Sequence, residues 1–302
     1  MNNIGNLMPI REQRKMKKWH PRRLAMLSLL AMASTAWISP SLAQEKPVYR
    51  FSPVNQYGIE LTASYWNPII EYVFKQSGVR LQLKIGRTSA DTTAYVIANE
   101  VDFIFSNHLF SPERDHLGWK VFGRRETPPL FGQIVVLADS PIQKIEQLAD
   151  QEVAFPGPEA LIAYKFPYAQ LQKKNIPIRV VFGGNMDGAF AQLTAGKVKA
   201  VGANSQLTEG WAKRENKAVR ILWKSEPLYD LALMASKNVP DKDLKAVTAA
   251  FLGMAKDTEG KKILANASEL VKLPATAGFV PSNGAEYAAY RNFYQTAPAN
   301  LR

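Results

Sequence analysis

Short runs of β-branched and aromatic residues alternate along the chain with longer segments whose apolar residues recur at helical spacing. In the longer segment 63–75, for example, Trp66, Ile69 and Val73 fall on one face of a helix. This alternation predicts an α/β fold. We expect strands over 48–53, 80–85, 102–105, 133–138, 152–155, 178–182, 199–203, 219–223 and 230–235, and helices over 63–75, 160–174, 187–195, 242–255, 259–267 and 284–294.

The last three predicted helices follow one another without an intervening strand. This arrangement indicates that the end of the chain returns to cover a sheet formed earlier.

The first 43 residues have the order of a secretory signal sequence. A basic stretch ending at Arg23 leads into the apolar run 24–38, and the small residues Ser41 and Ala43 follow. We therefore predict cleavage after Ala43 and export to the periplasm. An uncleaved membrane anchor is the alternative, although the apolar run is shorter than the ~20 residues that a spanning helix needs.

The charge and cysteine content narrow the function classes. Residues 1–43 hold seven of the 38 Lys and Arg residues and one of the 26 Asp and Glu residues, which leaves an excess of six basic residues beyond them. The basic residues beyond position 43 are spread along the chain and are not gathered with aromatic residues in a stripe. The sequence therefore does not support binding to a nucleic acid. The absence of cysteine excludes zinc–thiolate sites, iron–sulfur clusters and a lipidated N-terminal cysteine.

Two polar tripeptides come directly after predicted buried strands. Ser106-Asn107-His108 follows the strand 102–105, and Asn204-Ser205-Gln206 follows the strand 199–203. In open α/β sheets, ligands bind outside the carboxyl ends of the strands. Asn107, His108 and Asn204 are therefore candidate ligand contacts, with ordinary turn residues as the alternative.

Several segments together resemble the phosphate/phosphite/phosphonate-binding proteins of ABC transporters. The resemblance covers nearly all of the chain beyond the signal sequence. It is carried by the segments 65–68 (Tyr-Trp-Asn-Pro), 88–91 (Thr-Ser-Ala-Asp), 100–103 (Glu-Val-Asp-Phe), 139–142 (Asp-Ser-Pro-Ile), 183–193 (beginning Gly-Gly-Asn-Met-Asp-Gly), 195–198 (Ala-Gly-Lys-Val) and 203–206 (Ala-Asn-Ser-Gln).

The resemblance implies a two-lobed type II periplasmic binding protein with two crossover segments and a hinge that closes on the ligand. It would place the first lobe at 44–130 and 235–302, the second lobe at 137–227 and the crossovers at 131–136 and 228–234. It implies a monomer without a cofactor that delivers a small molecule to an ABC permease. The alternative partner is the ectodomain of a sensor kinase.

The start of the helix predicted at 160 is a candidate anion site. Its free backbone N–H groups and positive end can hold a phosphate-like group without a basic side chain. Relatives offer a run of hydroxyl residues here, whereas this chain has Glu159-Ala160-Leu161-Ile162. Glu159 either stabilises the first helical turn or points into the cleft, where its carboxylate would repel a dianion.

The remaining candidates are loop residues near predicted helix starts. Thr88 and Ser89 cap the next helix or contact the ligand, and Asn185 is expected to contact it, with Asp187 as the helix cap. Tyr164 belongs to either the cleft or the core. The candidate ligand-binding residues are Tyr57, Thr88, Ser89, Asn107, His108, Glu159, Ala160, Tyr164, Asn185 and Asn204.

Catalytic signatures are missing from the sequence. No Gly-x-Ser-x-Gly elbow, phosphate-binding P-loop or Gly-x-Gly-x-x-Gly turn occurs, and His108 has no sequence neighbours typical of a metal or catalytic site. We therefore expect no enzyme and no metal site. The expected function is capture of a small polar or anionic ligand, with a phosphonate- or phosphate-like oxyanion favoured.

Overall fold

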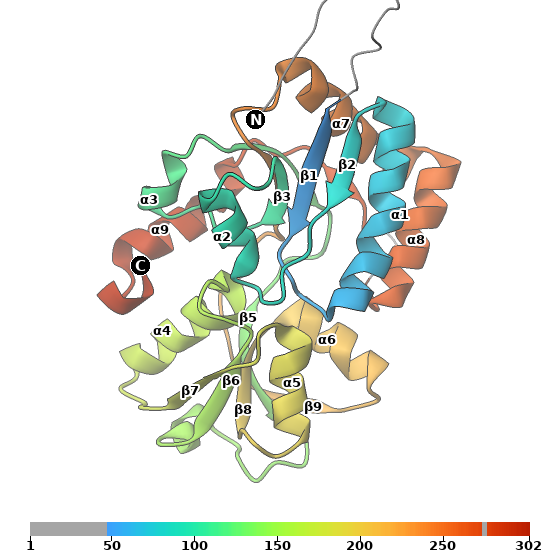
Figure 1. Ribbon diagram of the computed structural model, residues 1–302. Coiled ribbons are helices and arrows are strands. Elements are labelled where there is room, and N and C mark those ends of the chain that lie inside the picture. Colours follow the sequence, from blue (N-terminus) through green and yellow to red (C-terminus); the bar gives the residue numbers. More distant parts are fainter. Residues whose placement is uncertain (1–46, 274–276) are drawn as a thin grey trace, which may run out of the picture. The chain divides into compact units, whose positions relative to one another are not determined.

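A computed structural model describes residues 47–273 and 277–302. The predicted signal sequence, 1–43, lies outside the described residues. The described chain forms two β-sheets, each with helices against it (Figure 1). No helix in the described ranges is long and apolar enough to cross a membrane.

The first sheet has six strands in the order β11-β4-β10-β3-β1-β2. Strands β1, β2 and β3 run parallel, whereas β10 runs antiparallel to both of its neighbours, β3 and β4. The strands are β1 (Val48–Pro53), β2 (Arg80–Leu83), β3 (Phe103–Ser106), β4 (Lys120–Arg125), β10 (Ala232–Ala235) and β11 (Phe279–Val280).

The second sheet has five strands in the order β7-β6-β8-β5-β9. It repeats the plan of the first sheet, because β6, β7 and β8 run parallel and β5 runs antiparallel to both β8 and β9. The strands are β5 (Gly132–Leu137), β6 (Glu152–Phe155), β7 (Arg179–Phe182), β8 (Ala200–Asn204) and β9 (Val219–Lys224).

The chain passes between the sheets twice, over residues 126–131 and 225–231. The two passages lie side by side, since Leu130 and Leu228 exchange backbone hydrogen bonds of 2.8 Å in both directions. The ranges predicted as crossovers, 131–136 and 228–234, overlap strands β5 and β10. We call residues 47–125 and 232–302 the first lobe, and residues 132–224 the second lobe.

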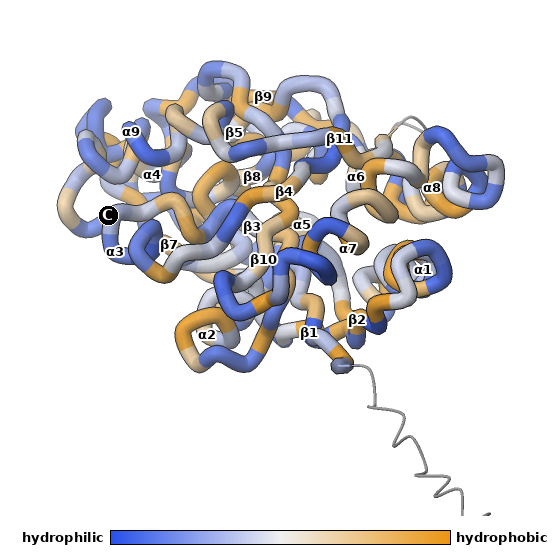
Figure 2. Tube along the Cα trace, turned by 90° about the horizontal axis from the view of Figure 1, so that it is seen from above, coloured by the Kyte–Doolittle hydropathy of each residue, from blue (hydrophilic) through white to orange (hydrophobic). Residues whose placement is uncertain are grey.

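The long helix α1 packs against α7 and α8 from the end of the chain. The three lie together beside the first sheet (Figure 1), and α7 also contacts β4 and β11. Along α8 hydrophobic and hydrophilic residues alternate (Figure 2), as expected of a helix with one buried face. The helices are α1 (Ile59–Ser77), α2 (Asp91–Ile97), α3 (Pro112–Asp115), α4 (Phe166–Lys173), α5 (Met186–Thr194), α6 (Ser205–Arg214), α7 (Asp241–Gly253), α8 (Thr258–Leu270) and α9 (Ala288–Thr296).

The helix predicted over 160–174 begins with a π-turn, Leu161–Lys165, before α4. Pro167 has no N–H, so the α-helical bond from residue 167 to the carbonyl of Ala163 cannot form. Two strand glycines let this turn lie close to the second sheet. A Cβ at Gly132 would lie 2.7 Å from the oxygen of Ile162, and one at Gly202 would lie 2.6 Å from that of Ala163.

Candidate functional site

A cavity of about 40 Å³ lies between the two lobes, where strands of both sheets end. Asn55 and His108, which follow β1 and β3, line it from the first lobe. Pro156, after β6, and Asn204, at the end of β8, line it from the second lobe. This is the carboxyl edge of the parallel strands, where α/β sheets bind ligands. A larger hollow of about 1600 Å³ lies between α4 and α9, away from these strand ends.

On the first-lobe side, polar side chains are held in place by neighbours. The amide of Asn55 donates to the backbone oxygen of Gly86 at 2.9 Å and accepts from the hydroxyl of Thr62 at 3.2 Å. Ser89 also lines the cavity and is 2% exposed, yet its Oγ has no hydrogen-bond partner within the described residues. A buried hydroxyl without a partner is a group that a ligand can satisfy.

His108 is buried at the cavity wall. Its Nδ1 lies 3.0 Å from the hydroxyl of Thr93, which leaves Nε2 as the ring nitrogen available to a ligand. Burial lowers the pKa of His108 from its usual 6.5 to about 4, although the nearby carboxylate of Glu159 opposes this shift. The imidazole is therefore neutral at neutral pH and presents one donor and one acceptor.

The second lobe presents the start of the helix that runs from Leu161 into α4. The N–H groups of residues 161–163 precede the first hydrogen bonds of this helix, so they have no partner within it. Ile162 and Ala163 both line the cavity. Ser89 faces the loop before this helix so closely that a Cβ at Gly157 would collide with its Oγ. The unpartnered hydroxyl of Ser89 thus lines the same cavity as Ile162 and Ala163, whose N–H groups have no partner within the helix.

Glu159 turns away from this cavity. Its carboxylate forms a two-bond ion pair with the guanidinium of Arg114 in the first lobe, with Nη2 3.0 Å from Oε1. Arg114 also donates to the backbone oxygen of His108 at 2.8 Å. Burial alone would raise the pKa of Glu159, but the hydrogen bonds and charge of Arg114 hold it below its ordinary value.

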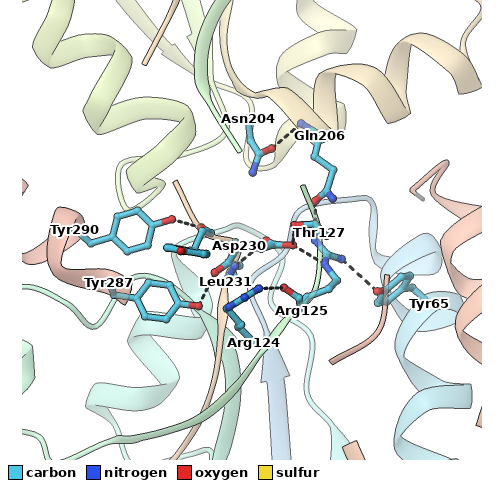
Figure 3. Close-up of polar contacts among 11 residues, drawn as sticks. Tyr65, Arg124, Arg125, Thr127, Asn204, Gln206, Asp230, Leu231, Tyr287 and Tyr290 are labelled. Carbon is cyan, nitrogen blue, oxygen red and sulfur yellow. Dashed lines mark hydrogen bonds and ion pairs between the residues drawn. The ribbon is translucent and has the colours of Figure 1, made fainter. Parts of the chain in front are cut away.

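A second ion pair lies deeper, beside the crossovers (Figure 3). Nε of Arg125 donates to Asp230 at 2.7 Å, and the other nitrogens donate to the hydroxyl of Tyr65 at 3.2 Å and to Oε1 of Gln206 at 3.1 Å. Tyr287 donates to the backbone oxygen of Asp230 at 2.6 Å. Burial disfavours the charged guanidinium, but the carboxylate of Asp230 raises the pKa of Arg125 above its ordinary value.

Five of the ten candidate residues line the cavity: Ser89, Asn107, His108, Ala160 and Asn204. Their role in binding stays a prediction.

The other five candidates make different contacts. The ring of Tyr57 is buried beneath the guanidinium of Arg214, and Tyr164 packs against the ring of Phe155. Glu159 is in the ion pair described above. The remaining two, Thr88 and Asn185, have local partners.

Thr88 and Asn185 both bond at helix starts. The hydroxyl of Thr88 donates to Asp91 at 2.8 Å, and Ala90 occupies the cap position of α2. Asn185, expected as a ligand contact, caps α5 by accepting from the N–H of Gly188 at 2.8 Å. Asp187, expected as the cap, instead accepts from Arg214 and from the N–H of Gly58.

Several lining residues were missed by the sequence analysis. Asn55 and Gln56 lie two and three residues beyond the end of β1, where the rule of strand ends would have found them. Met186, Leu207 and Leu231 are apolar, and no sequence pattern separates an apolar cavity wall from core. Ser205 and Gln206, expected in a loop, begin α6 with Asn204 as the cap.

The sequence over residues 51–287 matches the family of periplasmic substrate-binding proteins of phosphonate ABC transporters. The chain belongs to this family. It is thus a periplasmic binding protein of an ABC importer and not an enzyme, which favours a permease over a sensor kinase as its partner. No curated protein matches the sequence. The described residues contain no group of three His, Cys, Asp or Glu that could hold a metal.

Solved structures confirm the two-lobed fold of the binding protein. A binding component of an ABC phosphonate transporter from Pseudomonas aeruginosa superposes with a TM-score of 0.71 at 16% identity, covering 83% of this chain and 87% of that one. A Prochlorococcus marinus protein solved with methylphosphonate gives 0.69 at 15%, covering 82% and 97%. A Xanthomonas citri protein gives 0.61 at 14%, covering 84% and 97%.

Proposed function

We propose that the binding protein captures a small phosphonate with an uncharged substituent in the cavity between its lobes. The observation that carries this proposal is that one cavity is lined by the unpartnered buried hydroxyl of Ser89 and by the helix-start residues Ile162 and Ala163. Neutral donors at a helix start stabilise an oxyanion through their partial charges and the helix dipole. The neutral imidazole of His108 adds a further donor or acceptor.

The charge of the surroundings supports an uncharged substituent. None of the described residues lining the cavity is charged. The nearby carboxylates of Glu159, Asp187 and Asp230 are each paired with an arginine. A ligand that carried an ammonium group would have no free carboxylate to receive it, and an unpaired buried charge is costly.

The size of the cavity supports a ligand of few atoms. A water molecule needs roughly 10–15 Å³ on the same measure, so about 40 Å³ corresponds to about three water positions. Methylphosphonate, which the Prochlorococcus protein holds, is a ligand of this class. It combines three oxygens for the polar groups with one methyl group for apolar neighbours such as Ile162 and Leu207.

We further propose that the chain is exported with removal of its signal sequence and that it acts as a monomer. The signal sequence 1–43 is removed after Ala43, and one copy of the chain forms the whole binding site, because the cavity is lined from both lobes of a single chain. N-terminal sequencing of periplasmic protein and light scattering test these two points.

Titration calorimetry with methylphosphonate, phosphite, phosphate, sulfate and 2-aminoethylphosphonate tests the ligand class. We expect methylphosphonate or phosphite to bind and 2-aminoethylphosphonate to bind at least tenfold more weakly. Ser89→Ala should weaken binding about tenfold, since a hydrogen bond to a charged group is lost, whereas the control Ser140→Ala in the second lobe should not. Absence of binding by every oxyanion would contradict the proposal.

A further inference from the structure

The ion pair between Arg114 and Glu159 joins the two lobes at the edge of the ligand cavity. Arg114 lies in α3 of the first lobe, and Glu159 lies in the loop after β6 of the second lobe. The guanidinium meets the carboxylate through two hydrogen bonds, one of them 3.0 Å long. Such two-bond geometry fixes orientation as well as distance. The pair can therefore form only when the lobes are brought together.

Both partners are connected directly to the cavity wall. Arg114 donates to the backbone oxygen of His108 at 2.8 Å, and the ring of His108 lines the cavity. Glu159 precedes Ala160, which lines the cavity, and the unbonded N–H groups of residues 161–163. The pair thus positions the donors of one lobe against those of the other without touching the ligand itself.

The charges of the pair act on an anion in opposite directions. The carboxylate of Glu159 stands at the start of the helix that would hold an oxyanion, and its negative charge opposes the ligand. The guanidinium of Arg114 neutralises that charge. Lys165, whose ammonium lies 4.8 Å from the ring of Tyr294, adds positive charge nearby.

We propose that Arg114 and Glu159 form a latch that favours lobe closure, and that Arg114 also shields the bound oxyanion from the carboxylate of Glu159. Arg114 and Glu159 are positioning residues on this proposal. It deepens the proposed function, because the shielding part applies to an anionic ligand. The closure part applies to the protein with or without ligand.

Loss of each partner should therefore have unequal effects on affinity. Arg114→Gln breaks the latch and leaves the nearby negative charge of Glu159 without its counter-ion, so we expect the dissociation constant of methylphosphonate to rise about 10- to 100-fold. Glu159→Gln breaks the latch but removes the repelling charge, so we expect about a threefold rise. The double variant should fall between the two. A pair that only stabilised the fold would give equal losses.

The experiment combines calorimetry with small-angle X-ray scattering of the ligand-free protein. Both single variants should increase the radius of gyration, and the charge-swapped double variant Arg114→Glu with Glu159→Arg should restore it. The control is Glu146→Gln, which breaks the exposed pair of Glu146 with Lys174 inside the second lobe and should change neither measurement.

Scattering and affinity separate the outcomes. An unchanged radius of gyration in both single variants would overturn the latch even if no phosphonate bound the wild-type protein. Equal affinity losses in Arg114→Gln and Glu159→Gln would overturn the shielding. Failure of every oxyanion to bind the wild-type protein would overturn the proposed ligand class, together with the shielding, while the scattering result still decides the latch.

Discussion

Two of the arginine–carboxylate pairs near the cavity, Arg114 with Glu159 and Arg125 with Asp230, differ in what they join and in how deeply they lie. Arg125 and Asp230 are 1% and 0% exposed, whereas Arg114 and Glu159 are 20% and 21% exposed. Asp230 lies in the second crossover and Arg125 at the end of β4, so this pair stays within the first lobe and its crossover. Only the bond from Arg125 to Gln206 reaches the second lobe.

This comparison indicates that an arginine–carboxylate pair can have a different role depending on how deeply it is buried and which parts of the chain it joins. A fully buried pair cannot separate without stranding a charge in a medium of low dielectric constant, so it holds the fold together. A pair at the rim can exchange its partner for water, so it can open and close at small cost. The pair of Arg125 with Asp230 therefore stabilises the fold, whereas the pair of Arg114 with Glu159 acts in lobe closure.

The largest effect is expected from breaking the buried pair. Arg125→Met leaves the carboxylate of Asp230 buried without a counter-ion and removes the donors to Tyr65 and Gln206. We expect the free energy of unfolding to fall by about 3–5 kcal/mol, measured by urea denaturation. The double variant Arg125→Met with Asp230→Leu should recover part of the loss. A loss of unfolding free energy below about 1 kcal/mol would contradict the stabilising role given to the buried pair.

A smaller effect is expected from acid, through His108. Because its folded pKa is about 4 and its ordinary value 6.5, the unfolded chain takes up this proton first, so stability falls as the pH drops from 6.5 toward 4. Between pH 7.5 and pH 5 this one residue should cost roughly 2 kcal/mol. In His108→Gln that part of the pH dependence should be absent when unfolding is measured at both pH values. An unchanged pH dependence would show that His108 can be protonated while folded.

The smallest effect on stability is expected at the rim. Glu159→Gln should lower the free energy of unfolding by about 1 kcal/mol or less, because its partner Arg114 remains in contact with water. Chemical denaturation of this variant beside Arg125→Met measures the difference directly. A loss of unfolding free energy as large as that of Arg125→Met would mean that the pair of Arg114 with Glu159 also stabilises the fold.

The α/β class was predictable because apolar periodicity is a local property of the sequence, and the two-lobed fold was predictable from the resemblance to the binding proteins of ABC transporters. The strand predicted over 48–53 is β1, and that over 152–155 is β6. Strand β4 was missed, since its apolar residues Val121 and Phe122 are flanked by charged residues and a glycine. The predicted crossovers overlap β5 and β10, because an apolar run such as that of β5 gives no sign of which sheet it enters.

The site was predictable only where it follows strand ends or helix starts. Asn107, His108 and Asn204 were found by that rule and line the cavity. The partner of Glu159 was not predictable, because Arg114 is 45 residues away in sequence and only the approach of the two lobes brings them together. The sequence also could not predict that the hydroxyl of Ser89 lacks a hydrogen-bond partner, because this depends on the positions and hydrogen bonds of all its neighbours in the fold.

The π-turn at Leu161–Lys165 gives the cavity wall an unusual capacity to change. A π-turn holds about one residue more than an α-helical turn, so deletion of a single codon there shifts the preceding residues by one helical position, while Pro167 still lacks the N–H for a regular bond. Each residue shift rotates a helix face by about 100°, so Ile162 and Ala163 would leave the cavity and their neighbours would take their places. One such deletion would exchange several residues of the cavity wall at once. Point substitutions would need several steps to change the ligand preference in the same way.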